Sequence, residues 1–182
     1  MKKILSLILI CVSVLAFAAC GKEETVDTYA AAYGSKGTIV DTGVIKAVCP
    51  SGWNSVDAFD ITASADETAS NAIIFVKGGT SVSEDKPYIR IEYYGEEEEV
   101  KFPSSSDYDN SQDAGSVYIG SNTWTGFTAS VNNHSFACLK TADSSGGTFV
   151  AYLWMHTGEE VQSSINDDDV KLILQSAAVD VN

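Results

Sequence analysis

Basic residues are scarce in this sequence. Lys and Arg number 11 against 25 Asp and Glu, which gives a formal net charge of −14 over 182 residues. A nucleic-acid-binding protein needs a basic surface to neutralise phosphates, and attachment to anionic lipid by charge needs one too. The charge balance therefore predicts no nucleic-acid partner. The excess of acidic residues is explained by solubility beside a negatively charged cell surface. The alternative is that the protein binds a cation or a basic partner.

Recognised catalytic motifs are also lacking. The chain has no G-x-S-x-G, H-E-x-x-H, C-x-x-C or P-loop pattern. Ser83-Glu84-Asp85-Lys86 matches S-x-x-K, but it lies in a polar loop and has no S-D-N or K-T-G to accompany it. His134 and His156 are the only histidines, and neither has a second ligand at metal-binding spacing. We therefore expect no enzyme and no zinc site.

No apolar run is long enough to span a membrane, which takes ~20 residues. Residues 4–16 are apolar and uncharged, follow two lysines, and precede small residues and Cys20. This is the layout of a secretory signal. Phe17-Ala18-Ala19-Cys20-Gly21 resembles the lipobox of bacterial lipoproteins, with Phe17 in place of the usual Leu.

The lipobox resemblance implies cleavage after residue 19 and lipid attachment at Cys20. The protein is then expected to be extracytoplasmic, with the lipid on Cys20 as its link to the cell membrane, because two or more acyl chains hold a protein stably at a bilayer. Residues 16–18 also match A-x-A, the site of ordinary signal peptidase, so a soluble secreted protein is the alternative.

Cleavage would leave 163 residues, a size typical of one domain. Residues 1–19 contain two lysines and no acidic residue, so the formal charge changes from −14 to −16. We divide the mature chain into the lipidated cysteine with a tether (residues 20–36, with a helical turn near residues 29–32) and a single domain (residues 37–182).

Two cysteines of the mature domain, Cys49 and Cys138, have no assigned role. Outside the cytoplasm they can pair, and a bridge closing a loop of about 90 residues would stabilise the fold by about 4 kcal/mol. Two buried free thiols are the alternative, since each cysteine lies in an apolar, strand-like run.

Alternating and β-branched runs predict an antiparallel sheet. The expected strands are residues 37–49 (with a turn or bulge at Gly43), 57–62, 71–77, 87–94, 116–120, 122–131, 136–141 and 148–156. A C-terminal helix follows, with Asn166 as its N-cap. Its apolar stripe consists of Val170, Ile173, Leu174 and Ala177. The fold class is α+β: an antiparallel sheet with this helix, and optionally one N-terminal helix, packed on it.

Two short motifs resemble the PsbP-like family, which contains the photosystem II extrinsic subunit and small bacterial lipoproteins. They are Pro50-Ser51-Gly52-Trp53 after a strand and Ile173-Leu174-Gln175-Ser176 near the chain end. The resemblance covers residues 37–179 and implies an α+β sandwich. The chain departs from the family pattern between residues 56 and 71, where helical signal is weak. Because this fold serves unrelated functions, the resemblance implies no activity.

The most acidic stretch, residues 95–112, is long for a loop and is therefore either disordered or functional. Asp107, Asp109, Ser111 and Asp113 stand at the spacing of oxygen ligands in a calcium loop. The loop lacks the Gly and the bidentate Glu of an EF-hand, having Gln112 and residue 118 (a tyrosine) at those positions. We expect no cofactor, with weak calcium binding as the alternative.

An aromatic contact surface for a glycan or peptide is a further candidate site. Its members would be Trp53, Tyr108 and Trp124, with Tyr94 beside them, although aromatic residues in a small sheet protein are more often core.

These observations together predict a non-enzymatic binding or assembly module of the cell envelope, with a protein or glycan partner. One alternative is an envelope hydrolase in which Glu92 and Asp109 act as acid and base. Another is a calcium-dependent adhesion module.

Overall fold

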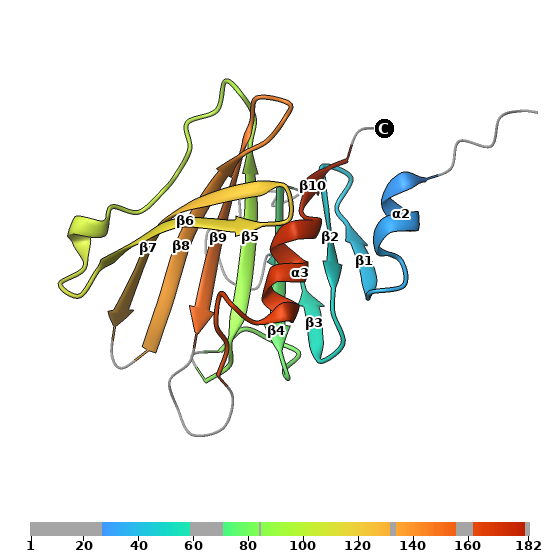
Figure 1. The fold of residues 1–182 in the computed structure, drawn as a ribbon. Helices are drawn as coiled ribbons and strands as arrows, with labels where there is room; N and C mark the ends of the chain where they lie inside the picture. The colour runs from blue at the N-terminus through green and yellow to red at the C-terminus, as the bar shows by residue number, and fades with distance from the viewer. Residues whose placement is uncertain (1–26, 59–70, 84, 132–133, 156–161, 181–182) are drawn as a thin grey trace, which may run out of the picture.

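The structure, a computed structural model, describes residues 27–58, 71–83, 85–131, 134–155 and 162–180. The predicted signal peptide, Cys20 and most of the tether lie outside these ranges, as do most of the strand predicted at 57–62 and His156. Within them the chain is α+β, as predicted (Figure 1).

Ten strands form two antiparallel sheets. The elements in chain order are α2 (Thr28–Tyr33), β1 (Thr38–Asp41), β2 (Ile45–Cys49), β3 (Trp53–Val56), β4 (Ala72–Lys77), β5 (Tyr88–Tyr94), the 3-10 turn η3 (Ser105–Asp107), β6 (Gln112–Ile119), β7 (Asn122–Val131), β8 (His134–Ala142), β9 (Thr148–Met155), α3 (Asp168–Ser176) and β10 (Ala178–Val179). The seven-stranded sheet has the order β3-β4-β5-β9-β8-β7-β6, and the three-stranded sheet has the order β1-β2-β10.

The large sheet has an inner and an outer face, because successive side chains of a strand point to opposite sides. On β5, Ile89 and Ile91 point to the inner face and belong to the main core, which α3 and β2 cover. Tyr88 and Tyr94 share the opposite parity and point to the outer face. The alternation predicted for this strand is confirmed.

Helix α3 buries the predicted apolar side chains in the main core. Val170, Ile173 and Leu174 are at most 1% exposed. The helix begins one residue later than predicted, with Asp167 rather than Asn166 as its N-cap. Asp168 and Asp169 lie in the first turn, where the helix dipole favours negative charge.

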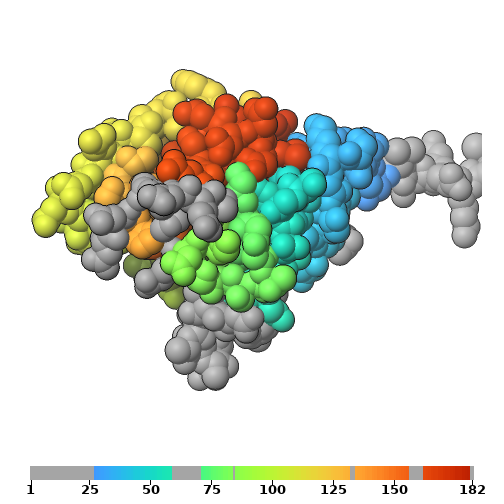
Figure 2. Space-filling view, turned by 90° about the horizontal axis from the view of Figure 1, so that it is seen from below, coloured from blue at the N-terminus to red at the C-terminus, as the bar shows by residue number. Residues whose placement is uncertain are grey.

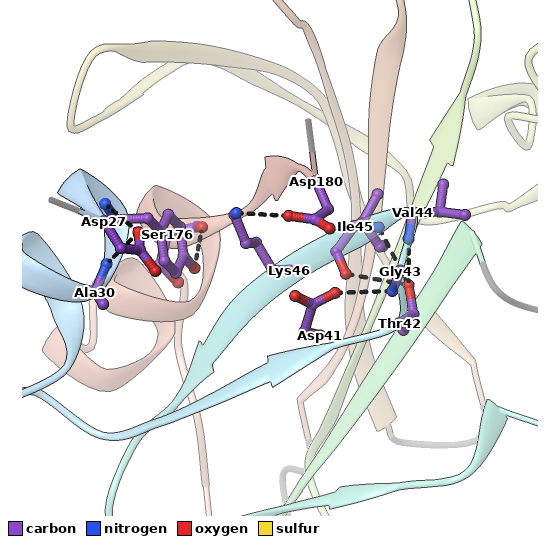
Figure 3. A network of polar contacts seen from close by, with 11 residues as sticks. Asp27, Ala30, Asp41, Thr42, Gly43, Val44, Ile45, Lys46, Ser176 and Asp180 are labelled. Carbon is purple, nitrogen blue, oxygen red and sulfur yellow. Dashed lines mark hydrogen bonds and ion pairs between the residues drawn. The ribbon is translucent and has the colours of Figure 1, made fainter. Parts of the chain in front are cut away.

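Helix α2 docks on the C-terminal end of α3. The Tyr29 hydroxyl donates to the Ser176 carbonyl (2.7 Å) and the Tyr33 hydroxyl donates to the Gln175 carbonyl (3.2 Å), which satisfies carbonyls that the helix end leaves without partners. Lys46 on β2 forms an ion pair with Asp180 at 2.7 Å (Figure 3). The same ammonium lies over the Tyr29 ring, 5.0 Å from its centroid. The second half of the predicted tether is therefore a packed helix.

Candidate functional site

Aromatic side chains from three neighbouring strands line up on the outer face of the large sheet. Trp154 on β9 is paired with Tyr88 on β5 and with Phe136 on β8. Both flanking rings have their centroids 6.1 Å from the Trp154 centroid, with interplanar angles of 17° and 16°. The His134 ring stacks on Trp154 at 5.3 Å. Cross-strand pairing thus builds one continuous aromatic row.

The acidic segment crosses the same face and forms a wall over it. We call residues 95–111 the strap; it connects β5 to β6 (Figure 1). The Tyr108 ring contacts Phe127 and Phe136, with centroids 5.8 and 4.9 Å apart. Phe102 packs edge-on against Phe127 at 5.9 Å. The strap is therefore held to the sheet by its two aromatic residues, although most of its side chains are polar.

Polar contacts add to this attachment. The Tyr152 hydroxyl on β9 donates to the Lys101 carbonyl at 3.0 Å. The Lys140 ammonium lies 4.9 Å from the centroid of the Phe102 ring, a cation–π distance. The acidic stretch, predicted to be either disordered or functional, has a defined path over residues 95–111, and its function stays a prediction.

An open groove of about 250 Å³ lies between the strap and the outer face. Among the residues that the structure describes, no charged side chain lines it; the lining residues are Tyr88, Pro103, Tyr108, Val131, Phe136, Ala137, Cys138, Tyr152, Leu153 and Trp154. The lining combines apolar ring surface with tyrosine hydroxyls, and concave sites of this composition are typical of small-ligand binding. We refer to this cavity as the aromatic groove.

A buried ion pair lies next to the aromatic groove on β5. Arg90, which is paired with Tyr152 across the two strands, donates to one carboxylate oxygen of Glu92. The other carboxylate oxygen accepts from the Tyr94 hydroxyl at 2.6 Å. Burial, together with the hydrogen bond to Glu92, raises the pKa of Tyr94. Burial also raises the pKa of Tyr152 to about 12, and the negative charge of Glu92 contributes.

This pairing bears on the predicted hydrolase. Both oxygens of Glu92 are engaged, so the carboxylate is poorly placed to accept a proton from a water or a substrate. Asp109, the other proposed carboxylate, is exposed on the strap.

The predicted aromatic contact surface is wrong for two of its three members. Trp53 and Trp124 are 5% and 0% exposed and belong to the main core on the inner face. The alternative stated for aromatic residues in a small sheet protein, a place in the core, holds for these two tryptophans. Tyr108 does lie at a candidate site, the aromatic groove. Tyr94 is buried and does not line the groove.

The residues predicted to bind calcium do not form a ligand cluster. Within the described ranges, no group of three or more His, Cys, Asp or Glu side chains could hold a metal ion, and those ranges include Asp107, Asp109 and Asp113. Asp113 is the second residue of β6, and its carboxylate accepts from the Gly115 amide at 2.8 Å. Ser111 precedes that strand and is half-buried. A calcium loop would have to curl its ligands around one ion, but here the chain is already extended in strand β6 from residue 112 onward.

Cys49 and Cys138 are both free and buried. Cys49 belongs to the main core on the inner face, whereas Cys138 belongs to the cluster on the outer face with Phe127 and Phe136. The disulfide alternative is therefore wrong and the free-thiol alternative holds, because the sheet separates the two side chains. Burial raises the pKa of both thiols, that of Cys138 to about 12, so neither is a reactive thiolate at neutral pH.

Comparison with known proteins gives little. No protein-family profile and no curated protein sequence matches the chain. A similar solved structure is that of LpqN, described as involved in cell envelope biogenesis of Mycobacterium tuberculosis. The two chains are 15% identical, the match covers 81% of this chain and 87% of LpqN, and the TM-score is 0.40. Similarity at that level carries no argument about function, and the PsbP-like resemblance is not confirmed.

Among the described residues, no helix is long and apolar enough to cross a membrane. Lipid attachment at Cys20 stays a prediction from the sequence, since that residue lies outside the described ranges.

Four groove residues were missed at the sequence level: Tyr88, Phe136, Tyr152 and Trp154. A signal for them existed, because Tyr88 alternates with the core residue Ile89, and Tyr152 and Trp154 alternate with the core residue Leu153. Aromatic residues at the outward parity of two strands could have indicated an aromatic outer face. That the two strands are neighbours in the sheet could not be read from them.

Proposed function

We propose that this protein is a non-enzymatic binding module, held outside the cytoplasmic membrane by a lipid on Cys20, that binds an envelope glycan in the aromatic groove. The observation that carries the proposal is the groove itself: a cavity of about 250 Å³ lined by five aromatic rings. The predicted lipobox and signal layout support the location.

A glycan fits the chemistry of the lining better than a protein surface does. Sugar rings have apolar C–H faces edged by hydroxyls, and the groove offers apolar ring surface beside the hydroxyls of Tyr88, Tyr108 and Tyr152. A stable protein–protein interface buries about 800 Å² on each partner, usually over a broad patch. A small concavity under a strap suits one or two sugar units.

A binding role also agrees with the polar groups near the groove. Glu92 is held by Arg90 and Tyr94, and the Cys138 thiol on the groove floor has a raised pKa. Neither group is prepared for proton transfer or nucleophilic attack, and the described lining residues include no Asp, Glu, His or Lys.

The test is co-sedimentation of the predicted mature chain, residues 20–182, with purified peptidoglycan sacculi stripped of protein. We expect the native chain to sediment with the sacculi. Trp154→Ala and Tyr108→Ala should abolish or strongly reduce sedimentation, because each removes a ring from the groove. Tyr118→Ala is the matched control, since Tyr118 is 77% exposed on the edge strand β6, outside the groove.

Thermal melting of each variant separates loss of binding from loss of folding. Tyr108→Ala leaves the strands intact, because Tyr108 lies on the strap, but it also removes one of the two rings that hold the strap to the sheet, so its melting temperature must match the native chain before its loss of sedimentation counts as a loss of binding. The glycan proposal fails if the native chain does not sediment, or if the folded groove variants sediment as well as the native chain does. Sedimentation with untreated envelope material but not with stripped sacculi would assign the groove to a protein partner instead.

A further inference from the structure

We infer that the aromatic groove selects saccharides that carry free, protonated amino groups over their neutral N-acetylated counterparts. This inference rests on the proposed glycan-binding function and names the ligand class. Three features of the outer face carry it: a lining without charge, carboxylates at the rim, and neighbouring cations that are already engaged.

The rim of the groove is acidic at the point where the strap enters the lining. Tyr108 is a lining residue, and its chain neighbours Asp107 and Asp109 are both exposed. The strap as a whole has six carboxylates against a single lysine, Lys101. A ligand seated against Tyr108 would therefore lie next to a chain segment with two exposed carboxylates, whereas none of the described lining residues is charged.

Two basic side chains on the strands beside the groove, Arg90 and Lys140, already have partners. Arg90 is bound to Glu92 in a buried ion pair, with side chains 16% and 12% exposed. Lys140 lies over the ring of Phe102, on the sheet beneath the strap. An anionic glycan would find no cation among the lining residues.

The hydrogen bond that Tyr152 makes also favours a cationic ligand. Its hydroxyl proton is donated to the Lys101 carbonyl, so only the lone pairs of its oxygen are left for a ligand. An ammonium group has donors and no acceptor, and therefore complements a hydroxyl in this state. Aromatic faces add cation–π attraction to an ammonium that approaches them.

The net charge of the whole protein also favours a cationic ligand. The predicted mature chain has a formal charge of −16, derived from −14 by removing the two lysines of the signal. A field of this sign raises the local concentration of cationic ligands and repels anionic ones, and its reach shrinks as salt increases.

The test compares two probes of equal length: the tetramer of glucosamine and the tetramer of N-acetylglucosamine. Binding to the mature chain is measured by titration calorimetry at pH about 6, where an amine remains protonated. We expect the glucosamine tetramer to bind roughly five- to tenfold tighter at low salt, as two exposed carboxylates would provide. That advantage should shrink as ionic strength approaches about 0.15 M.

A pair of charge-matched variants locates the effect. Asp107→Asn with Asp109→Asn should remove most of the preference and leave affinity for the acetylated tetramer unchanged. Glu97→Gln with Glu99→Gln removes the same charge from the same strap but away from the groove lining, and should leave most of the preference intact.

Equal or tighter binding of the acetylated tetramer would overturn the inference and leave the glycan-binding function standing. A preference that survives Asp107→Asn with Asp109→Asn would also overturn it, because the rim carboxylates would then not be its source. If neither tetramer binds and the sacculi do not capture the chain, the proposed function itself fails.

Discussion

Trp53 and Trp124 are both core indoles, but their ring nitrogens have different surroundings. The Trp53 indole N–H donates to a carboxylate oxygen of Asp169 at 2.8 Å, and Lys77 pairs with the same carboxylate at 3.0 Å. The Trp124 indole N–H has no hydrogen-bond partner among the described residues. Although burial alone would raise it, the pKa of Asp169 is lowered, because Trp53, Lys77 and the Val170 amide stabilise the ionised form.

Trp53→Phe should therefore destabilise the protein more than Trp124→Phe does. Both substitutions remove the same volume from the main core, so their cavity costs are comparable. Only Trp53→Phe also removes a hydrogen bond to a charged group, which is worth about 1.5–3 kcal/mol. We expect a difference of about 1–2 kcal/mol in the free energy of unfolding, measured by denaturant titration. Equal losses would mean that the Asp169 contact contributes nothing to stability.

Alternation of apolar and polar residues predicts which side chains of a strand share a face, but not whether that face is buried or exposed. The pattern of β5 correctly separated Ile89 and Ile91 from Tyr88. The alternation of β7 could not place Trp124 in the core, because the sequence does not say which face of the sheet α3 covers. Cys138 shows the same limit: its apolar surroundings were evident, but its separation from Cys49 by the sheet was not.

At the scale of elements, the strap depends on few anchors, and Tyr152 is one of them. Its hydroxyl must stay protonated to donate to the Lys101 carbonyl, and its pKa in the folded protein is about 12. A tyrosine in the unfolded chain titrates near 10. Because the folded-state pKa is raised, the contribution of Tyr152 to stability is complete below pH ~10 and is lost as the pH rises towards ~12.

Tyr152→Phe should therefore make stability less sensitive to alkaline pH. The variant is expected to be less stable than the native chain at neutral pH, and the gap should narrow between pH ~10 and ~12. Tyr29→Phe is a useful comparison: burial raises the pKa of Tyr29 too, but this residue anchors α2 and not the strap. Acrylamide quenching of Trp154, whose ring lines the groove, follows opening of the strap directly. If Tyr152→Phe and the native chain lost stability in parallel over this pH range, Tyr152 would not be the titrating anchor.

Most strands were predictable from the sequence. The position of the strap on the sheet was not. Strands β4, β5, β7, β8 and β9 lie within a few residues of their predicted bounds, since each has a clear apolar or alternating pattern. Residues 95–111 are mostly polar, and they are held mainly by the contacts of Phe102 and Tyr108 with Phe127 and Phe136, together with the bond from Tyr152 to the Lys101 carbonyl. Such contacts depend on strand neighbours far away in the sequence.

At the scale of the whole molecule, the α+β class followed from the run of strands and the single strong helix, but the division into two sheets did not. The turn at Gly43, which has φ +82°, separates β1 from β2 as expected. The sheet that these strands form is completed by β10, more than 120 positions further along, and two residues of strand give no pattern to read. Pairing between the chain ends is a property of the packed molecule.

The arrangement of the two ends predicts how the groove faces a membrane. Helix α2 lies beside β1 at one end of the molecule, and the strap lies at the other end (Figures 1 and 2). If Cys20 carries lipid, the stretch from residue 20 to Asp27 reaches at most about 25 Å. The α2 end is then held near the bilayer, and the aromatic groove is directed away from it, towards the polymers that surround the cell.

Fluorescence quenching in liposomes tests this orientation. With the lipidated chain tethered to vesicles that contain a headgroup-attached quencher, Trp154 should be quenched little, because the groove lies at the distal end. A reporter at the α2 end, introduced as Tyr33→Trp in a Trp154→Phe background, should be quenched strongly. The other two tryptophans, Trp53 and Trp124, are buried and supply the same background in both proteins. Equal quenching of the two reporters would show that the domain has no fixed orientation, and stronger quenching of Trp154 would place the groove against the membrane and remove it from the reach of an envelope glycan.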